Sequence, residues 1–448
     1  MKTSAEKLSI RLPHMKISVI GTGYLGATHA ACMAELGLEV VGVDNDAAKI
    51  EALSRGELPF YEPELPELLS KHVKNGKLKF TTDYSEIVDC DVHFICVGTP
   101  QIKGGLAADL SYVKSAFAAV GAVAKPGSLL VGKSTVPVGT AEELSKQVPA
   151  HAELAWNPEF LREGFAVEDT LRPNRLVVGV TSDRAEEILK EVYAVNLKEG
   201  TPWVRANLPT AELVKVSANS FLATKISFIN AMAEICETAG GDVTVLAKAI
   251  GYDPRIGNRF LQAGIGFGGG CLPKDIRAFM ARAEELGASQ AVEFLKDIDA
   301  INLRARQRVI NVVQRELGKE IGMDLKSFKI AVLGATFKPD SDDVRDSPAL
   351  DIAAQIHAAG AQVTVHDPKG IEPARKRFPA LTFAEKIEDC VAGADLILHL
   401  TEWKQYRELD PVAIKKLVKQ AKVLDGRNML DRDKWQAAGW DFHALGRA

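Results

Sequence analysis

Cys271 is the residue of this chain best suited to nucleophilic chemistry. It lies in segment 266–275 (GFGGGCLPKD), where glycines allow a tight turn and a close approach of the backbone to a ligand. Pro273 stands where a helix can begin, because the first helical turn needs no donor there. The sulfur would then lie near a helix N-terminus with Lys274 close by, and both features favour the thiolate over the thiol. The alternative is a buried structural cysteine, the commoner state of a free cysteine.

A dinucleotide-binding fingerprint stands near the N-terminus. Residues 21–26 (GTGYLG) fit GxGxxG between a predicted strand and a predicted helix. The glycines Gly21, Gly23 and Gly26 would let a pyrophosphate approach the helix N-terminus. Asp44 ends the second predicted strand, 18 residues after Gly26. Its carboxylate would accept hydrogen bonds from a ribose 2′-hydroxyl and repel a 2′-phosphate, so NAD is favoured over NADP.

A nucleophilic sulfur beside a hydride acceptor predicts oxidation through a covalent thioester. Lys215 and Asn219 are four residues apart and would share a face of a helix. Asp275 follows Cys271 by the same spacing, which places a carboxylate one turn beyond the sulfur. Such groups can move protons and stabilise oxyanions. Taken alone, however, the pair Lys215 and Asn219 is more often a solvated helix stripe.

Polar residues also follow other predicted strands. Glu159 and Glu163, in segment 157–164 (NPEFLREG), could activate water, with surface carboxylates as the alternative. Thr99 and Thr135 each come after an apolar run. Loops at the carboxyl ends of parallel strands line the ligand crevice, so both threonines are candidates for cofactor or water contacts. Each by itself is more often a turn or cap residue.

Composition sets limits on the function. The 448 residues suggest about three domains. The net charge of −4 gives no support to binding of nucleic acid or a membrane surface. Six cysteines without a CxxC pair and scattered histidines indicate neither a metal site nor a disulfide framework, and the pattern fits a reducing cytoplasm. Residues 1–14 lack the apolar core of a secretion signal and read as a flexible extension, and no stretch is long enough to span a membrane.

Apolar runs alternate with helical segments at both ends of the chain, which is typical of parallel α/β sheets. The predicted strands are 17–20, 40–43, 92–97, 129–131, 176–180, 329–333, 363–365, 396–400 and 423–424, and residues 25–36 are the first crossover helix. Two long helices are predicted in between, one capped by Thr210 and ending near Ala239, the other following Ser289 and ending near Gly318. Apolar residues surround the first of them, so it packs inside the monomer or against a second subunit: Phe221, Ile226, Phe228, Ile229 and Met232.

These stretches together resemble the UDP-glucose/GDP-mannose dehydrogenase family. The matching segments are 21–26, STVP at 134–137, NPEFLREG at 157–164, ELVKVSANSFLATKISFIN at 212–230, FGGGCLPKD at 267–275 and FKPDSDDVRDSP at 337–348. The resemblance implies two Rossmann-like parallel-sheet domains joined by a long-helix dimerisation domain. With the extension 1–14, the expected boundaries are 15–208 for the NAD-binding domain, 209–322 for the helical central domain and 323–448 for the nucleotide-sugar-binding domain.

The resemblance also assigns residue roles at the matching positions. Cys271 would be the nucleophile, Lys215 and Asp275 would assist proton movement and steady oxyanions, Asn219 would hold substrate, and Glu159 with Thr135 would handle the hydrolytic water. The residues implied around NAD are Gly21, Gly23, Tyr24, Leu25, Gly26, Asp44, Lys49, Thr99, Thr135, Glu163, Lys274 and Arg345. Those implied around the nucleotide sugar are Glu159, Phe160, Leu161, Arg162, Glu163, Lys215, Asn219, Arg255, Phe260, Leu261, Gln262, Ala263, Gly264, Gly268, Lys338 and Arg427.

The reaction that the resemblance implies is a four-electron oxidation that uses two NAD. The glucose branch is favoured by the segment FLATKISFIN, so the expected conversion is UDP-glucose to UDP-glucuronate, with dTDP-glucose or another nucleotide sugar as the alternative. A homodimer or a larger homo-oligomer is expected, with Arg255 reaching into the partner's site. Competing interpretations are a two-electron dehydrogenase, an epimerase or a catalytically silent scaffold, and the number of NADH formed per sugar discriminates among them.

Overall fold

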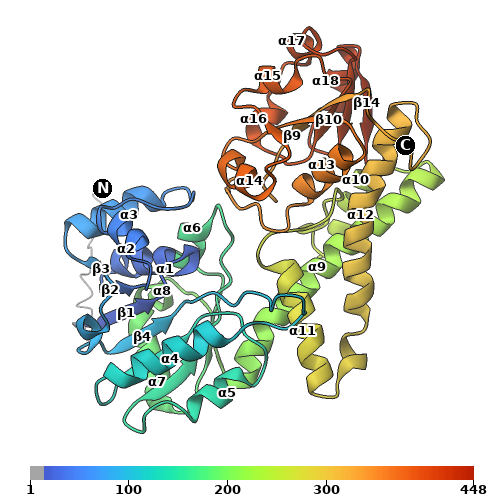
Figure 1. The fold of residues 1–448 in the computed structure, drawn as a ribbon. Helices are drawn as coiled ribbons and strands as arrows, with labels where there is room; N and C mark the ends of the chain where they lie inside the picture. Colours follow the sequence, from blue (N-terminus) through green and yellow to red (C-terminus); the bar gives the residue numbers. More distant parts are fainter. Residues whose placement is uncertain (1–14, 448) are drawn as a thin grey trace, which may run out of the picture. The chain divides into compact units, whose positions relative to one another are not determined.

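The computed structural model describes residues 15–447 and divides into two compact units (Figure 1). The chain passes from the first unit to the second between Val216 and Ser217, inside one long helix. Each unit contains its own sheet, as the alternating pattern predicts. The expected extension 1–14 lies outside the described residues.

The first unit is built on an eight-stranded sheet in the order β3-β2-β1-β4-β5-β6-β7-β8. Its strands are β1 (Lys16–Ile20), β2 (Glu39–Val43), β3 (Leu78–Thr81), β4 (Val92–Ile95), β5 (Leu129–Gly132), β6 (Glu153–Trp156), β7 (Leu176–Gly179) and β8 (Trp203–Ala206). Its helices are α1 (Tyr24–Glu35), α2 (Ala47–Ser54), α3 (Leu65–Lys74), α4 (Ser111–Val123), α5 (Thr140–Ser145), α6 (Ala166–Leu171), α7 (Asp183–Val192) and α8 (Ala194–Lys198).

One expectation for this sheet is wrong in part. The strands from β3 to β6 are parallel, but β6 pairs with β7 in antiparallel fashion, and β7 and β8 are parallel to each other. A run of apolar residues marks a buried strand without showing its direction, so the sequence pattern could not reveal this reversal.

Apolar strands in the centre of the first sheet are buried on both faces. Ile17 and Val19 of β1 pack in a core that includes α1, α3 and α6, whereas Ile20 packs in a second core with α4 and α5. Because side chains alternate along a strand, each central strand feeds both cores. Parallel strands connected in this way bring the loops after β1, β4 and β5 to one edge of the sheet.

The second unit combines helices with a six-stranded parallel sheet in the order β11-β10-β9-β12-β13-β14. Its strands are β9 (Lys329–Leu333), β10 (Gln362–His366), β11 (Thr382–Phe383), β12 (Leu396–His399), β13 (Lys422–Asp425) and β14 (Asp441–Ala444). Its helices are the greater part of α9 (Leu208–Ala239), α10 (Val243–Gly251), α11 (Leu272–Glu285), α12 (Phe294–Glu316), α13 (Pro348–Ala358), α14 (Ile371–Arg377), α15 (Ile387–Val391), α16 (Lys404–Arg407), α17 (Pro411–Lys415) and α18 (Arg432–Ala437).

The long helix α9 begins earlier than expected. Asn207, rather than Thr210, provides the capping group, because its Oδ1 accepts a hydrogen bond of 3.0 Å from the Thr210 backbone N–H. The apolar residues around α9 are only partly covered within the monomer. Ile229 is fully buried, whereas Phe221 and Phe228 are 66% and 46% exposed. Among residues 15–447, neither α9 nor another helix is long and apolar enough to cross a membrane.

We predict that Gly334→Ala destabilises the second unit strongly. Gly334 follows β9 with φ +119°, and a Cβ there would lie 2.4 Å from Thr401 Oγ1. Strained backbone and overpacking together should lower the free energy of unfolding by about 2–4 kcal/mol. Gly318→Ala is the matched control, because Gly318 also has a positive φ but a Cβ would meet nothing within 4 Å. Equal losses in denaturant unfolding of the two variants would contradict the prediction.

Candidate functional site

The predicted dinucleotide loop lies between β1 and the N-terminus of α1. A Cβ at Gly26 would stand 1.8 Å from the Gly21 carbonyl oxygen, so the turn accepts no side chain there. A Cβ at Gly23 would meet nothing within 4 Å, and Gly23 occupies the N-cap position of α1. There is thus room beside Gly23 for a ligand at the N-terminus of α1, and a helix N-terminus is where a pyrophosphate binds.

Asp44 follows β2 beside this loop. Its Oδ2 accepts hydrogen bonds from the Thr22 backbone N–H at 2.8 Å and from Lys49 Nζ at 2.9 Å. Burial by itself would raise the pKa of Asp44, but the hydrogen bonds from Lys49, Asp46 and Thr22 hold it below its usual value. The result is an ionised carboxylate at the end of β2, the position that reads a ribose hydroxyl. Lys49, implied as a cofactor contact, forms an ion pair with Asp44.

The loops after β4 and β5 are tied together by hydroxyl groups. Thr99 Oγ1 donates to the Thr135 carbonyl at 2.8 Å, and Ser134 Oγ donates to the Val97 carbonyl at 2.6 Å. The structure thus brings Thr99 and Thr135 together at one edge of the sheet. The Thr99 hydroxyl already serves this backbone contact, which makes its role partly structural.

Glu159 follows β6 and is held from three sides. Its Oε1 accepts from the backbone N–H groups of Phe160 at 2.7 Å and Leu161 at 3.0 Å. Its Oε2 forms an ion pair of 3.2 Å with Lys133, which is only 3% exposed. Sequence reasoning missed Lys133, although a lysine directly after the apolar run 129–131 is a signal that could have been used. Two cations lie near the Phe160 ring: the Arg175 guanidinium is 3.8 Å and Lys215 Nζ is 5.5 Å from the ring centroid.

A second missed residue, Glu62, anchors the loop that carries Glu163. The Glu62 carboxylate is 1% exposed and accepts 2.7 Å hydrogen bonds from the backbone N–H groups of Gly164 and Ala166. The hydroxyl of Tyr24, at the start of α1, donates to the same carboxylate. Burial and the contact with Glu62 raise the pKa of Tyr24, so it stays a neutral donor. Glu62 therefore connects the dinucleotide loop to segment 157–164.

In the second unit, Cys271 occupies the N-cap position of α11 and is exposed. The sequence prediction of a sulfur at a helix start is therefore confirmed, and the alternative of a buried cysteine is wrong. The other five cysteines are buried, and within residues 15–447 no disulfide joins any of the six. The exposed thiol at the end of a glycine-rich loop is accessible to a substrate.

Asp275, one turn after Cys271, joins the predicted catalytic residues of this unit. It is 2% exposed, and its Oδ2 accepts a 2.6 Å hydrogen bond from Asn219 Nδ2 of α9. Its Oδ1 accepts from Lys274 Nζ at 2.5 Å. Lys274, implied as a cofactor contact, is thus committed to Asp275 in this structure. Lys215 and Asn219 both lie on α9, as predicted, although Lys215 is on the part of the helix that belongs to the first unit.

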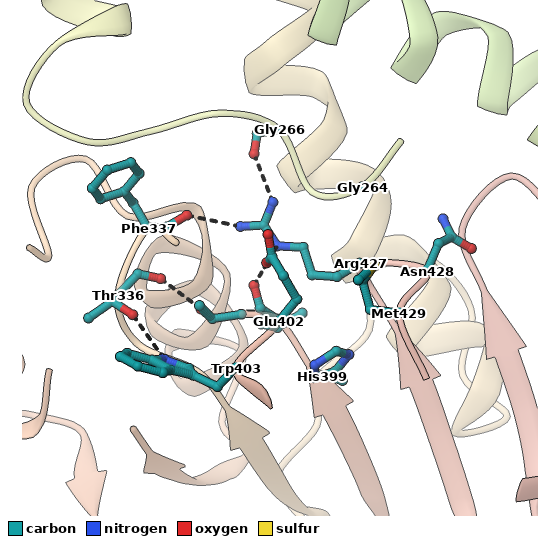
Figure 2. Close-up of polar contacts among 12 residues, drawn as sticks. Gly264, Gly266, Thr336, Phe337, His399, Glu402, Trp403, Arg427, Asn428 and Met429 are labelled. Atoms are coloured by element: carbon teal, nitrogen blue, oxygen red, sulfur yellow. Dashed lines mark hydrogen bonds and ion pairs between the residues drawn. The ribbon is translucent and has the colours of Figure 1, made fainter. Parts of the chain in front are cut away.

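Segment 260–266, which contains most of the residues predicted to line the nucleotide-sugar site, packs against the loops that follow β9, β12 and β13 (Figure 2). Arg427 donates to three backbone carbonyls, those of Leu400 at 2.7 Å, Gly266 at 3.3 Å and Phe337 at 3.3 Å. Its Nε also lies 3.3 Å from Glu402 Oε2. Arg427 therefore connects three segments of the second unit, those that contain Gly266, Phe337 and Leu400. This structural role adds to the substrate contact that the resemblance implies for Arg427.

Two asparagines near Arg427 form hydrogen bonds with the backbone of segment 260–264. Asn230 accepts a 2.8 Å hydrogen bond from the Gly264 N–H, and Asn428 donates to the Ala263 carbonyl at 3.3 Å. Phe260 adopts a left-handed φ of +64°, an uncommon conformation that is often found at functional sites. Lys338 lies 5.5 Å from the centroid of the Phe337 ring. Leu261 is buried, whereas Gln262 is exposed.

Three of the predicted arginines instead face carboxylates that are close to them in the sequence. Arg162 pairs with Asp169, Arg345 with Asp343 and Arg255 with Asp253, and all three arginine side chains are at least half exposed. Arg255 and Arg345 therefore lie at the surface of the second unit, and Arg162 lies at the surface of the first. Across residues 15–447, no group of three or more His, Cys, Asp or Glu side chains could hold a metal ion.

Three family models match the chain in order. The models of the UDP-glucose/GDP-mannose dehydrogenase family match as follows: the NAD binding domain at residues 15–196, the central domain at 209–304 and the UDP binding domain at 331–432. The chain belongs to the UDP-glucose/GDP-mannose dehydrogenase family. Its NAD binding domain contains the Gly21–Gly26 loop and Asp44, so the cofactor of the chain is NAD.

Relatives cover nearly the whole chain. A UDP-glucose 6-dehydrogenase of Rhizobium meliloti is 41% identical over 97% of this chain and 100% of its own length. A UDP-glucose 6-dehydrogenase of Bacillus subtilis is 40% identical over 96% of this chain and 93% of its own. The solved UDP-glucose dehydrogenase of Pyrobaculum islandicum is 35% identical with a TM-score of 0.88, and the match covers 98% of this chain and 100% of that one.

We predict that Asp44→Ala weakens NAD binding. Loss of an ionised acceptor for the ribose costs about 1.5–3 kcal/mol, which corresponds to a rise of about 10- to 100-fold in KM for NAD. Asp46→Ala is the matched control, because Asp46 caps α2 through the Lys49 backbone N–H in the same loop. A KM for NAD that is unchanged in Asp44→Ala, or raised equally in Asp46→Ala, would contradict the assignment.

Proposed function

We propose that this chain oxidises UDP-glucose to UDP-glucuronate through a thioester on Cys271. The observation that carries the proposal is the exposed Cys271 at the start of α11, with Asp275 held one turn away by Asn219 and Lys274. The names of the relatives from Rhizobium meliloti and Bacillus subtilis support UDP-glucose as the substrate. The test compares acid formation from UDP-glucose with acid formation from dTDP-glucose, UDP-N-acetyl sugars and GDP-mannose.

The residues of the chain divide the work of the first half of the reaction. Bound NAD supplies the hydride acceptor for each of the two oxidations. Lys215 takes the proton of the C6 hydroxyl as the alcohol becomes an aldehyde. Cys271 then attacks the aldehyde carbon to form a thiohemiacetal, and Asn219 and Lys215 donate to the oxyanion. Oxidation of this adduct leaves the substrate as a thioester of Cys271.

Hydrolysis completes the reaction. Glu159, fixed by the Phe160 and Leu161 N–H groups and by Lys133, orients water, with Thr135 as its partner. The water oxygen bonds to C6, the C–S bond breaks and the sulfur regains a proton. Thioester hydrolysis is downhill, so the whole sequence is effectively irreversible.

The expected site residues keep their roles in this proposal. Glu163, Lys274 and Arg345 contact NAD, Lys338 binds the phosphates of the nucleotide sugar, and the segment from Phe260 to Gly264 with Gly268 lines its site. The domain boundaries remain 15–208, 209–322 and 323–448. Six cysteines that form no disulfide among residues 15–447 suit the reducing cytoplasm, where we place the enzyme.

A homodimer accounts for the exposed face of α9. Phe221, Phe228 and Ile235 are spaced seven residues apart and are 66%, 46% and 57% exposed. This spacing places the three side chains in one stripe along the helix, which is the pattern of a helix that packs against another. Arg255, 87% exposed in its side chain, is then free to reach a partner's site.

We predict that the wild-type protein forms two molecules of NADH and one molecule of UDP-glucuronate for each UDP-glucose consumed. We also predict that Cys271→Ser lowers the rate of acid formation by about 10³-fold or more. Serine is a far weaker nucleophile and its adduct would stall at the aldehyde or ester level. Cys236→Ala, at a buried cysteine, is the control and should retain turnover. Acid production by Cys271→Ser at the wild-type rate would refute the nucleophile assignment, and one NADH per sugar would indicate a simple dehydrogenase.

We further predict that the double variant Phe221→Asp, Phe228→Asp sediments as a monomer while the wild type sediments as a dimer or larger assembly. Two charges in the stripe would have to be buried without partners in the interface. Tyr112→Asp, which changes an aromatic residue that is 55% exposed on α4, should leave the mass unchanged. A monomeric wild type, or an undisturbed assembly in the double variant, would contradict the dimer.

A further inference from the structure

A small cavity lies beside Glu159 inside the first unit. Its volume is about 30 Å³, and its lining includes His29, Lys133, Glu159, Thr170 and Tyr193. This volume is the space that the centre of a water molecule can occupy. One water molecule needs about 10–15 Å³ of such space, so the cavity has room for about two. A polar lining of this kind holds water, whereas empty cavities are apolar.

His29 is the side chain that most clearly requires a ligand in this cavity. It is 1% exposed, and neither ring nitrogen has a hydrogen-bond partner among residues 15–447. Burial and the nearby charge of Lys133 lower the pKa of His29, so it is neutral, with one nitrogen as donor and one as acceptor. Thr170, 6% exposed, lines the same cavity with its hydroxyl beside the Cys32 thiol, and the hydroxyl oxygen, which has two lone pairs, can also accept a hydrogen bond from water. Leaving such buried groups unsatisfied is costly.

Lys133 lines the cavity together with Glu159 and forms an ion pair with its carboxylate. Its ammonium lies 3.0 Å from Asn157 Oδ1, 3.4 Å from the Tyr193 hydroxyl and 3.2 Å from Glu159 Oε2. Burial by itself would lower the pKa of Lys133, but Tyr193 and Glu159 raise it, and the group stays charged. A charged lysine with three fixed acceptors has no freedom to turn, so it holds Glu159 in one orientation.

We infer that this cavity is a hydrated site that stores water for the hydrolytic step, with His29 and Thr170 binding that water and Lys133 acting as the positioning residue of Glu159. The inference rests on the proposed function, because the step it serves is the hydrolysis of the Cys271 thioester. In that step, water adds to the C6 carbonyl, the C–S bond breaks with its electron pair going to sulfur, one proton returns to the thiolate and the second leaves as the product acid ionises.

Lys133→Met tests the positioning role in a single turnover with excess NAD. Rapid quenching and intact-protein mass spectrometry follow formation and decay of the adduct on Cys271. We expect decay to slow by about 10- to 100-fold, as for a misplaced catalytic group, while adduct formation and the KM for UDP-glucose change less than about two-fold. Lys114→Met is the matched control, because it removes an exposed ion pair of 2.8 Å with Glu143 and should leave decay unchanged. Wild-type decay in Lys133→Met, or equal slowing of formation and decay, would overturn the inference.

His29→Leu and Thr170→Val test the hydration without removing a charge, and they keep the inference open to refutation if Lys133→Met does not fold. If water satisfies these groups, both variants should have a lower Tm and slower adduct decay. A raised Tm would show that the polar atoms face a dry cavity and would overturn the inference. If the wild-type protein yields no acid from UDP-glucose, the proposed function itself has failed. If the wild-type protein yields acid and the variants release it at the wild-type rate, the proposed function stands and only this inference has failed.

Discussion

The close approach of two backbone segments fixes the position of Cys271. A Cβ at Gly268 would lie 2.1 Å from the Asp346 carbonyl oxygen, and a Cβ at Gly269 would lie 2.8 Å from the Phe337 ring. The Gly269 N–H donates to the Arg345 carbonyl at 2.9 Å. A side chain at Gly268 would require the backbone to move, and one at Gly269 would displace the Phe337 ring, so the loop that precedes the nucleophile has essentially one way to pack. The start of α11, and with it the sulfur, follows from that packing.

Buried charges reinforce this constraint from the other side of the loop. Arg306, 4% exposed, donates to the Phe267 carbonyl at 3.2 Å and to Asp346 Oδ1 at 2.8 Å. Asn302 accepts from the Phe267 N–H at 2.7 Å and donates to its carbonyl at 3.0 Å. Breaking a buried pair of this kind leaves an unpaired charge, which is strongly destabilising. The first unit uses the same device, because Glu62 and Asp44 hold backbone N–H groups of the loops that carry Glu163 and the dinucleotide site.

Sequence reasoning was sufficient where local chemistry decides the structure. The glycines of 21–26, Asp44 and Cys271 could be found because their roles follow from backbone freedom, strand ends and helix starts. It was insufficient where a contact joins segments far apart in the chain. Lys133, Glu62 and Arg306 were missed since their partners lie elsewhere in the sequence, and the antiparallel β6–β7 pairing was missed because apolar runs carry no direction. The cap of α9 at Asn207 rather than Thr210 shows that even a correct helix has uncertain ends.

The central claim is that the Cys271 sulfur attacks C6 of the sugar. A crystal structure of the wild-type protein with UDP-glucuronate and NAD tests it most directly, because the product keeps every substrate contact and cannot react further. We expect Cys271 Sγ to lie about 3–3.5 Å from C6, the separation of reacting atoms in a near-attack geometry. A bound product whose C6 lies beyond about twice that distance from the sulfur, in a protein closed around both ligands, would contradict it.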